Sequence, residues 1–494
     1  MTATTGERMP VAAASRITSR NGPAPLAWLR ERGMGASVLV AAISSAFGVV
    51  LISATGYIAA LLRADPYVGD SEMLAFVLGF LTVLLVGVAV YVASIVTANT
   101  FATVVAGRTR RIALLRLIGA SARAQRAEVG RQGLVVGVIG AVLGLIAGTA
   151  LAGGGVWLAG RALGVGELDF VLVRADLLIP AAIVVLTTWA AAWAGSRRVL
   201  TVTPLQALGG AVETSRDEVA GRRGRNIAAL ALLVIGGALL GLGVIVGLVN
   251  PLGVVVAFFG GILSFTGLAL GAVLVMPPAL RLVGRAFGGS ATARLAAENA
   301  LRYPERSSRM AIGVVMGVTL VTMFAVAIES TKAVLTASSG GVLPTDMAAL
   351  LDAFSSIMMG LVAVSAVIAG VGLVNLLTIG VVQRRRELGL LRAIGVSNGQ
   401  VRRMVLLEAA HITITATATG LVLGIAYGWV GAQSLLGSVP TDPDMPAPMT
   451  FVLPAVPLLP VIAIVAATAV LTLVAAVVPT RLATRVAPVE ALAE

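Results

Sequence analysis

The sequence predicts an all-α membrane protein with ten transmembrane helices in a 4+2+4 order, in which the two groups of four are parallel repeats and no large extracytoplasmic domain is present. Three observations predict this fold. Hydrophobic residues make up 58% of the 494 residues and charged residues only 12%, apolar runs are long enough to cross a bilayer, and an arginine-rich stretch occurs twice. A soluble chain carries about twice that charged fraction, so a soluble globular fold is excluded.

The ten spans follow from their length, because about 20 apolar residues are needed for a helix to satisfy its own backbone across the hydrocarbon core. The first apolar run is too long for the core of a signal peptide, which has about 7–15 residues. The spans are expected at 37–62, 73–105, 132–154, 177–195, 227–249, 252–276, 310–331, 353–381, 405–430 and 453–478.

The charges predict the orientation of these spans. With alternating segments that start inside, the inner side holds 32 of the 36 Lys and Arg against 12 acids, and the outer side holds four basic residues against 11 acids. This positive-inside distribution predicts that both termini lie in the cytoplasm. It also explains the high isoelectric point by topology, so no nucleic-acid partner is expected.

An internal repeat supports the grouping of the spans. The stretch "GRTRRIALLRLIGASARAQRAEVGRQ" (107–132) and residues 383–408 agree at 10 of 26 positions without a gap. Matching positions, such as Arg108 and Arg384, are 276 residues apart (384 − 108 = 276), and this offset is called the repeat distance below. The predicted organisation is a cytosolic tail with an interfacial helix (1–36), a first four-span unit (37–211), a charged linker (212–226), a two-span insert (227–277) and a second four-span unit (278–494). Glycines at matching positions, Gly144 and Gly148 against Gly420 and Gly424, are expected to let neighbouring helices approach closely.

Each arginine-rich stretch is expected to form a helical elbow on the cytosolic side. In "QRRRELGLLRAIGVSNGQVRRMVLLEA" (383–409), Gly395 suits the left-handed residue that ends a helix. Ser397 and Gln400 have the spacing of a capping box for a second helix, which leads into the ninth span. Arginines that only set the orientation of the spans would explain the positive charge. They would not explain why the same glycine turn and serine occur at matching positions in both stretches.

Residues 384–397, "RRRELGLLRAIGVS", resemble the cytosolic signature of the FtsX-like permeases, the membrane subunits of ABC transporters of the MacB and lipoprotein-releasing type. Each four-span unit ends in a similar motif, "VTPLQAL" (202–208) with Pro204 and "VAPVEAL" (486–492) with Pro488. These two motifs and the stretch 298–311 are also similar to that family. The resemblance implies that the elbows are coupling helices that dock on a cytosolic ABC ATPase, with two ATPase copies for one chain. The implied coupling residues are Arg386, Glu387, Gly389, Leu391, Arg392, Gly395 and Ser397 in the second elbow, and Arg116, Gly119 and Ser121 in the first.

No catalytic, cofactor or metal site is expected in this chain. Cysteine is absent, the one histidine, His411, is interpreted as a structural contact near Glu408, and the only lysine, Lys332, lies outside any phosphate-binding loop motif. ATP and magnesium are therefore expected on the partner ATPase and not on this chain.

Two functions remain open at the level of sequence. The first is the permease of an ABC transporter that moves an amphipathic molecule, such as a lipid, a hydrophobic peptide or an antibiotic. The second is a mechanotransmitter that passes the ATPase-driven change of shape to a cell-envelope hydrolase or a sensor kinase. The short outer loops, of about 10–22 residues, are too small for a capture domain and favour a substrate that enters from the bilayer.

Overall fold

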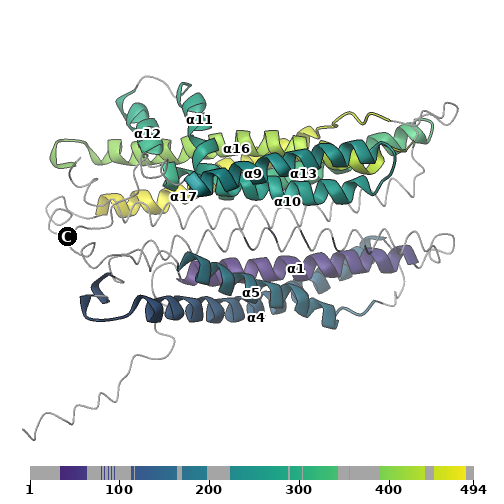
Figure 1. The fold of residues 1–494 in the computed structure, drawn as a ribbon, viewed down its shortest axis with the longest axis horizontal. Coiled ribbons are helices and arrows are strands. Elements are labelled where there is room, and N and C mark those ends of the chain that lie inside the picture. The colour runs from purple at the N-terminus through teal and green to yellow at the C-terminus, as the bar shows by residue number, and fades with distance from the viewer. Residues whose placement is uncertain are drawn as a thin grey trace, which may run out of the picture.

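The computed structural model describes residues 34–63, 113–163 without Arg116, 170–196, 223–302 without 287–289, 304–342, 392–439 and 450–485, with isolated positions in 79–94 and at Ser355 and Leu390. Most of these residues are helical, and no strand occurs among them. The helices, labelled as in Figure 1, are α1 (Met34–Arg63), α4 (Ala122–Leu163), the short 3-10 helix η3 (Ala175–Leu177), α5 (Leu178–Gly195), α9 (Arg223–Gly247), α10 (Gly253–Leu270), α11 (Ala272–Gly284), α12 (Ala291–Arg302), α13 (Pro304–Ser338), α16 (Asn398–Leu436) and α17 (Leu458–Arg485).

Seven helices of the described part are long and apolar enough to cross a membrane, which makes the protein a multi-pass membrane protein. They are α1, the helices α4 and α5, the pair α9 and α10, and the helices α13 and α16, and each coincides with a predicted span. The tenth predicted span begins as the apolar segment Leu458–Leu473 of α17. The second and eighth predicted spans lie almost entirely outside the described residues, so the count of ten and the 4+2+4 order remain predictions.

The two repeats pack in the same way. In the first repeat α4 packs against both α1 and α5, and α1 also contacts α5. In the second repeat α16 packs against both α13 and α17, and α13 also contacts α17. Figure 1 shows α1, α4 and α5 as one group on one side of the molecule, with the helices of the second repeat on the other.

Glycines make close helix contacts in both repeats, at the predicted positions. A β-carbon added to Gly148 would lie 2.8 Å from the carbonyl oxygen of Ala46 on α1. A β-carbon added to Gly424, the counterpart of Gly148 at the repeat distance, would lie 2.5 Å from the Cβ of Thr322 on α13. Thr322 is itself the counterpart of Ala46 at the same distance, so the repeat keeps its packing register as well as its sequence. The predicted role of these glycines in close helix packing is confirmed.

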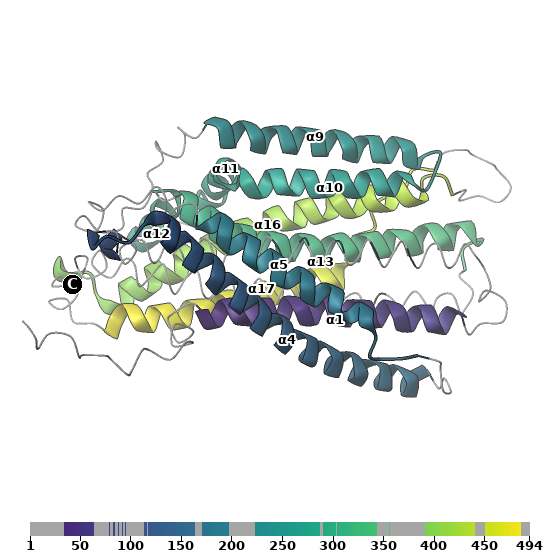
Figure 2. The same cartoon turned by 60° about the horizontal axis from the view of Figure 1, so that its bottom comes forward.

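The insert forms a helical hairpin that lies beside the second repeat. Its turn is tight because the side chain of Asn250 accepts a hydrogen bond from the backbone N–H of Leu252, at 2.9 Å. Figure 2 shows α9 and α10 side by side along α16, and both helices contact it. The hydroxyls of Ser264 and Tyr427 lie 2.9 Å apart and join α10 to α16.

The same hairpin also contacts the second predicted span of the first repeat. Tyr91 lies 2.8 Å from the hydroxyl of Thr266 and packs edge-to-face on Phe265 of α10, with ring centres 6.3 Å apart. Tyr427 packs on Phe265 at 6.5 Å. Helix α10 therefore links the two repeats through aromatic side chains.

The lone histidine makes a buried structural contact, as predicted. Its Nε2 lies 2.7 Å from the backbone carbonyl oxygen of Leu280, near the end of α11. His411 is fully buried. The contact joins α11 to α16, several helical turns after the second elbow.

Candidate functional site

Both elbows contain the predicted left-handed glycine. Gly119 has φ +100° and Gly395 has φ +104°, and no other residue type has a positive φ in the described part of the chain. The backbone N–H of Ala120 donates to the carbonyl oxygen of Leu115, at 2.9 Å, which is the hydrogen bond that closes a Schellman motif. The N–H of Gly395 donates to the carbonyl of Arg392 at 3.1 Å, the second bond of the same motif.

A serine caps the helix that follows each glycine. The predicted capping box is present at the second elbow: Ser397 Oγ accepts from the N–H of Gln400 at 3.2 Å, and the Gln400 side chain accepts from the N–H of Ser397 at 2.9 Å. At the first elbow Ser121 Oγ accepts from the N–H of Ala124 at 3.1 Å. Alanine at 124 has no side-chain acceptor, so the first elbow has only half of the box.

Each elbow also exposes a pair of apolar side chains on its helical side. Leu114 and Ile118 are 50% and 81% exposed, and their counterparts at the repeat distance, Leu390 and Ile394, are 55% and 72% exposed. Residues four apart lie on one face of a helix, so each pair forms a short apolar ridge. Outside a membrane-spanning segment, contiguous exposed apolar side chains are typical of an interaction surface, and these two ridges are candidates for one.

The two elbows are supported by different neighbours. The guanidinium group of Arg126 lies 3.9 Å from the ring centre of Trp193, which ties the start of α4 to the end of α5. At the second elbow, Val401 and Met404 of α16 pack instead against Ala296 of α12. Both supports fix the first turns of the helix behind the elbow, so the exposed glycine turn projects from a rigid base.

The structure describes only some of the predicted coupling residues. Gly119, Ser121, Gly395 and Ser397 form the turns and caps just described, and Arg392 lies half-buried in the helical turn before Gly395. The other predicted coupling residues lie outside the described residues: Arg116, Arg386, Glu387, Gly389 and Leu391.

The sequence placed Leu390 and Ile394 beside the arginines of the second elbow as an apolar ridge, but the predicted list of coupling residues omits them and their counterparts Leu114 and Ile118. The signal for them was present, because leucine at 114 and 390 and isoleucine at 118 and 394 are identical at the repeat distance. The support of Arg126 by Trp193 carried no such signal, since it joins the start of α4 to the end of α5 and no local spacing relates the two residues.

The fold and the duplicated elbows together define a class: a multi-pass membrane protein with two similarly packed repeats, each presenting a capped helical turn. Two segments of the chain, residues 83–204 and 359–488, match the family model described as FtsX-like permease C-terminal, and together they make up just over half of the chain. The chain belongs to this family of ABC transporter permeases. The first positions of the two matches, 83 and 359, are themselves separated by the repeat distance.

Curated relatives are similar to parts of the chain. The ABC transporter permease YtrF of Bacillus subtilis is 35% identical over 66 residues, covering 13% of this chain and 15% of the relative. A probable export ATP-binding/permease protein of Pseudomonas fluorescens is 30% identical over 139 residues, covering 28% of this chain and 19% of the relative. The macrolide export ATP-binding/permease protein MacB of Bdellovibrio bacteriovorus is 35% identical over 85 residues, covering 17% and 12%. The chain thus matches less than a fifth of the length of each of these relatives.

Proposed function

We propose that the chain is the permease subunit of an ABC transporter in the bacterial cell membrane, with both termini in the cytoplasm, and that a separate cytosolic ATPase docks on its two elbows. The observation that carries the proposal is the duplicated turn: Gly119 and Gly395 in the left-handed conformation, each followed by a serine cap and preceded by an exposed apolar pair. Two such elbows suit two ATPase copies, which would bind the ATP and magnesium.

The chemistry of the elbows fits a docking surface. An apolar ridge anchors a helix in a groove, and nearby arginines supply charge complementarity and orientation. Because the capped turns lead directly into α4 and α16, movement of the ATPase would be passed to helices that run through the core of each repeat. Glycines hold these helices against α1 and α13 over several turns, so motion at the elbow would be carried along the packed pair.

We further propose that the transported molecule is amphipathic and reaches the permease from within the bilayer. A hydrophilic substrate needs polar groups along its path, because the hydrocarbon core is costly for polar groups. Among the described residues, the spans offer chiefly serine and threonine hydroxyls for this purpose. The export functions in the names of two of the relatives support transport over signalling to an envelope partner.

The test is reconstitution with the proposed partner ATPase, isolated by its co-purification with the wild-type chain. Arg392→Glu should reduce co-purification of the ATPase and the stimulation of its hydrolysis, while insertion in the membrane stays normal. Arg63→Glu, a charge reversal in the last turn of α1 at its predicted outer end, is the matched control for docking. Stimulation of hydrolysis by phospholipids or hydrophobic peptides, and not by sugars or amino acids, is expected. Wild-type coupling in Arg392→Glu would contradict the docking assignment.

A further inference from the structure

The two repeats differ at the outer half of their third span, where α4 and α16 correspond. In the first repeat a shallow apolar groove of about 510 Å³ lies along α4, and Figure 2 shows α4 at the edge of the bundle. Neighbouring side chains on this helix, such as Leu143 and Leu151, are exposed by half or more. The groove is lined mainly by Leu145, Ile146, Thr149, Ala150 and Gly153 of α4 and by Leu172.

In the second repeat, side chains occupy the position that corresponds to the groove. Trp429, the counterpart of Gly153 at the repeat distance, packs on Phe451 with ring centres 5.8 Å apart and donates a hydrogen bond from Nε1 to the carbonyl of Val452 at 2.8 Å. Gln433, the counterpart of Trp157, is fully buried and bonded to the backbone of Thr450 and Val452. These side chains fasten the segment before α17 onto α16.

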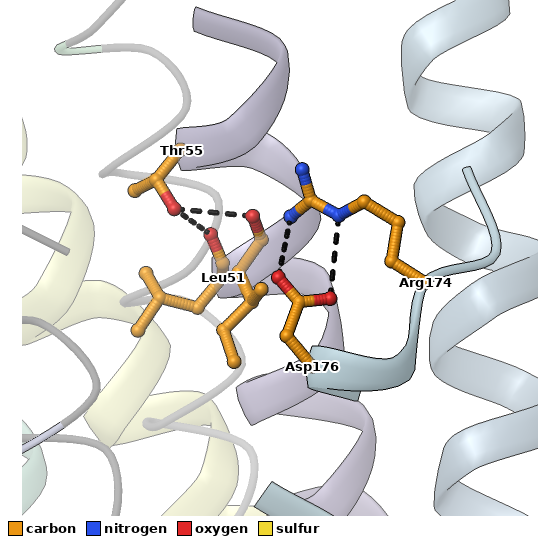
Figure 3. Close-up of polar contacts among 5 residues, drawn as sticks. Leu51, Thr55, Arg174 and Asp176 are labelled. Carbon is orange, nitrogen blue, oxygen red and sulfur yellow. Dashed lines mark hydrogen bonds and ion pairs between the residues drawn. The ribbon is translucent and has the colours of Figure 1, made fainter. Parts of the chain in front are cut away.

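The far wall of the groove in the first repeat is held in place without such side chains. Phe170 packs edge-to-face on Tyr57 of α1, with ring centres 5.5 Å apart. Arg174 forms an ion pair with Asp176 at 2.9 Å, beside the turn of α1 where Thr55 donates to the carbonyl of Leu51 (Figure 3). Leu172 lies between these two anchored positions, so the groove is a built feature and does not depend on a loose loop.

A positively charged side chain, that of Arg161, lies beyond the groove on the same helix. Trp157 and Arg161 follow Gly153 at intervals of four residues, which places the three on one face of α4. The Arg161 guanidinium lies 4.7 Å from the ring centre of Trp157, and Trp157 is 60% exposed. Eight residues of helix place Arg161 about 12 Å beyond Gly153 toward the outer end. Tryptophan and arginine at that level are typical of the membrane interface, where phosphate groups lie.

We propose that this groove binds one acyl chain of a phospholipid of the outer leaflet, with the lipid phosphate at Arg161. The apolar lining suits the chain, and a guanidinium group binds phosphate through paired hydrogen bonds. The function assigned to the site rests on the proposed transporter: the first repeat would receive the amphipathic substrate, while the second repeat, with Trp429 in the groove, would not.

Binding is tested on the purified chain in nanodiscs without the ATPase, so its outcome is separate from that of the transport proposal. A phosphatidylcholine with a photoreactive group in mid-chain is irradiated, and labelled peptides are mapped. We expect labelling of residues 145–154 in the wild type. Gly153→Trp copies the residue of the second repeat, and its side chain displaces the tip of Leu172, since even a β-carbon would lie 2.9 Å from Leu172 Cδ2.

Gly155→Trp is the matched control, because a β-carbon there meets nothing within 4 Å. We expect Gly153→Trp to lower labelling about fivefold or more, which corresponds to the lost burial of one or two methylene groups. The control should label as the wild type does. Arg161→Gln should lower labelling by the phospholipid and leave labelling by a photoreactive diacylglycerol unchanged.

Equal labelling of the two tryptophan variants would overturn the groove as a site. Equal labelling of the wild type by phospholipid and diacylglycerol would overturn the role of Arg161. A binding result as expected, combined with no ATPase response to lipids in the reconstituted complex, would retain the site and reject the transport proposal.

Discussion

Replacement of Gly395 tests the coupling elbow most directly, because its surroundings isolate one physical cause. At φ +104° a side chain is strained, yet a β-carbon there would meet nothing within 4 Å. The whole penalty therefore comes from the backbone, at about 1–2 kcal/mol for an ordinary residue. If the turn must keep this shape to dock, that energy lowers the docking-competent population about 5–30-fold.

A graded series makes the prediction sharper. Asparagine tolerates the left-handed region better than alanine, and a β-branched residue tolerates it worst. Coupling should therefore fall in the order Gly, Asn, Ala, Val at position 395. Gly399→Ala is the control, because Gly399 lies in the first turn of α16, where alanine is favoured by about 0.5–1 kcal/mol.

The assay is co-purification with the ATPase and ATP hydrolysis by the reconstituted complex, each measured against the amount of folded permease. Gly119→Val should reduce coupling less than Gly395→Val does. The first elbow has Arg111 where the second has Glu387, so we expect it to dock more weakly and to contribute less to coupling. Wild-type coupling in Gly395→Val, or an equal loss in Gly399→Ala, would refute the assignment of the turn to docking.

Three other predictions follow from the packing and the topology. Because the chain has no cysteine, a single cysteine at Ser339 should react with an impermeant reagent from outside, and one at Arg392 should not; the reverse pattern would show that the orientation is inverted. Gly424→Leu should cost about 1–3 kcal/mol by overpacking against α13 and lower the melting temperature, whereas Gly431→Leu, in open space, should leave it nearly unchanged. Tyr427→Phe should remove the hydrogen bond to the serine of α10 and cost about 0.6 kcal/mol, measured in a double-mutant cycle with that serine replaced by alanine; a coupling energy of zero would show that the bond does not stabilise the hairpin.

The predictable part of the structure is the part encoded by local or repeated signals. The turn at Gly395 and the cap at Ser397 follow from residue types at fixed spacing, and the helices follow from apolar length. The close packing at Gly148 and Gly424 was predictable because the repeat distance pointed to both. These signals need no knowledge of which helices are neighbours.

Contacts between different spans could not be predicted in this way. Membrane helices are apolar on most faces, so periodicity does not show which face meets protein and which meets lipid. The bridge from Tyr91 through Phe265 to Tyr427 and the stacking of Arg126 on Trp193 are decided by helix arrangement alone. The groove beside Gly153 is a further case, since a glycine in a membrane helix gives the same sequence signal whether its space is filled or empty.

The hairpin of α9 and α10 has a consequence for the facing of the second repeat. A pair of crossings returns the chain to the side from which it started, so everything after it keeps its facing. In the predicted topology, removal of the whole hairpin would leave both elbows on the cytoplasmic side, whereas removal of one helix alone would turn α12 and the second elbow toward the other side of the membrane. In the predicted topology, a segment inserted at this junction preserves the facing of the second repeat only if it crosses the membrane an even number of times.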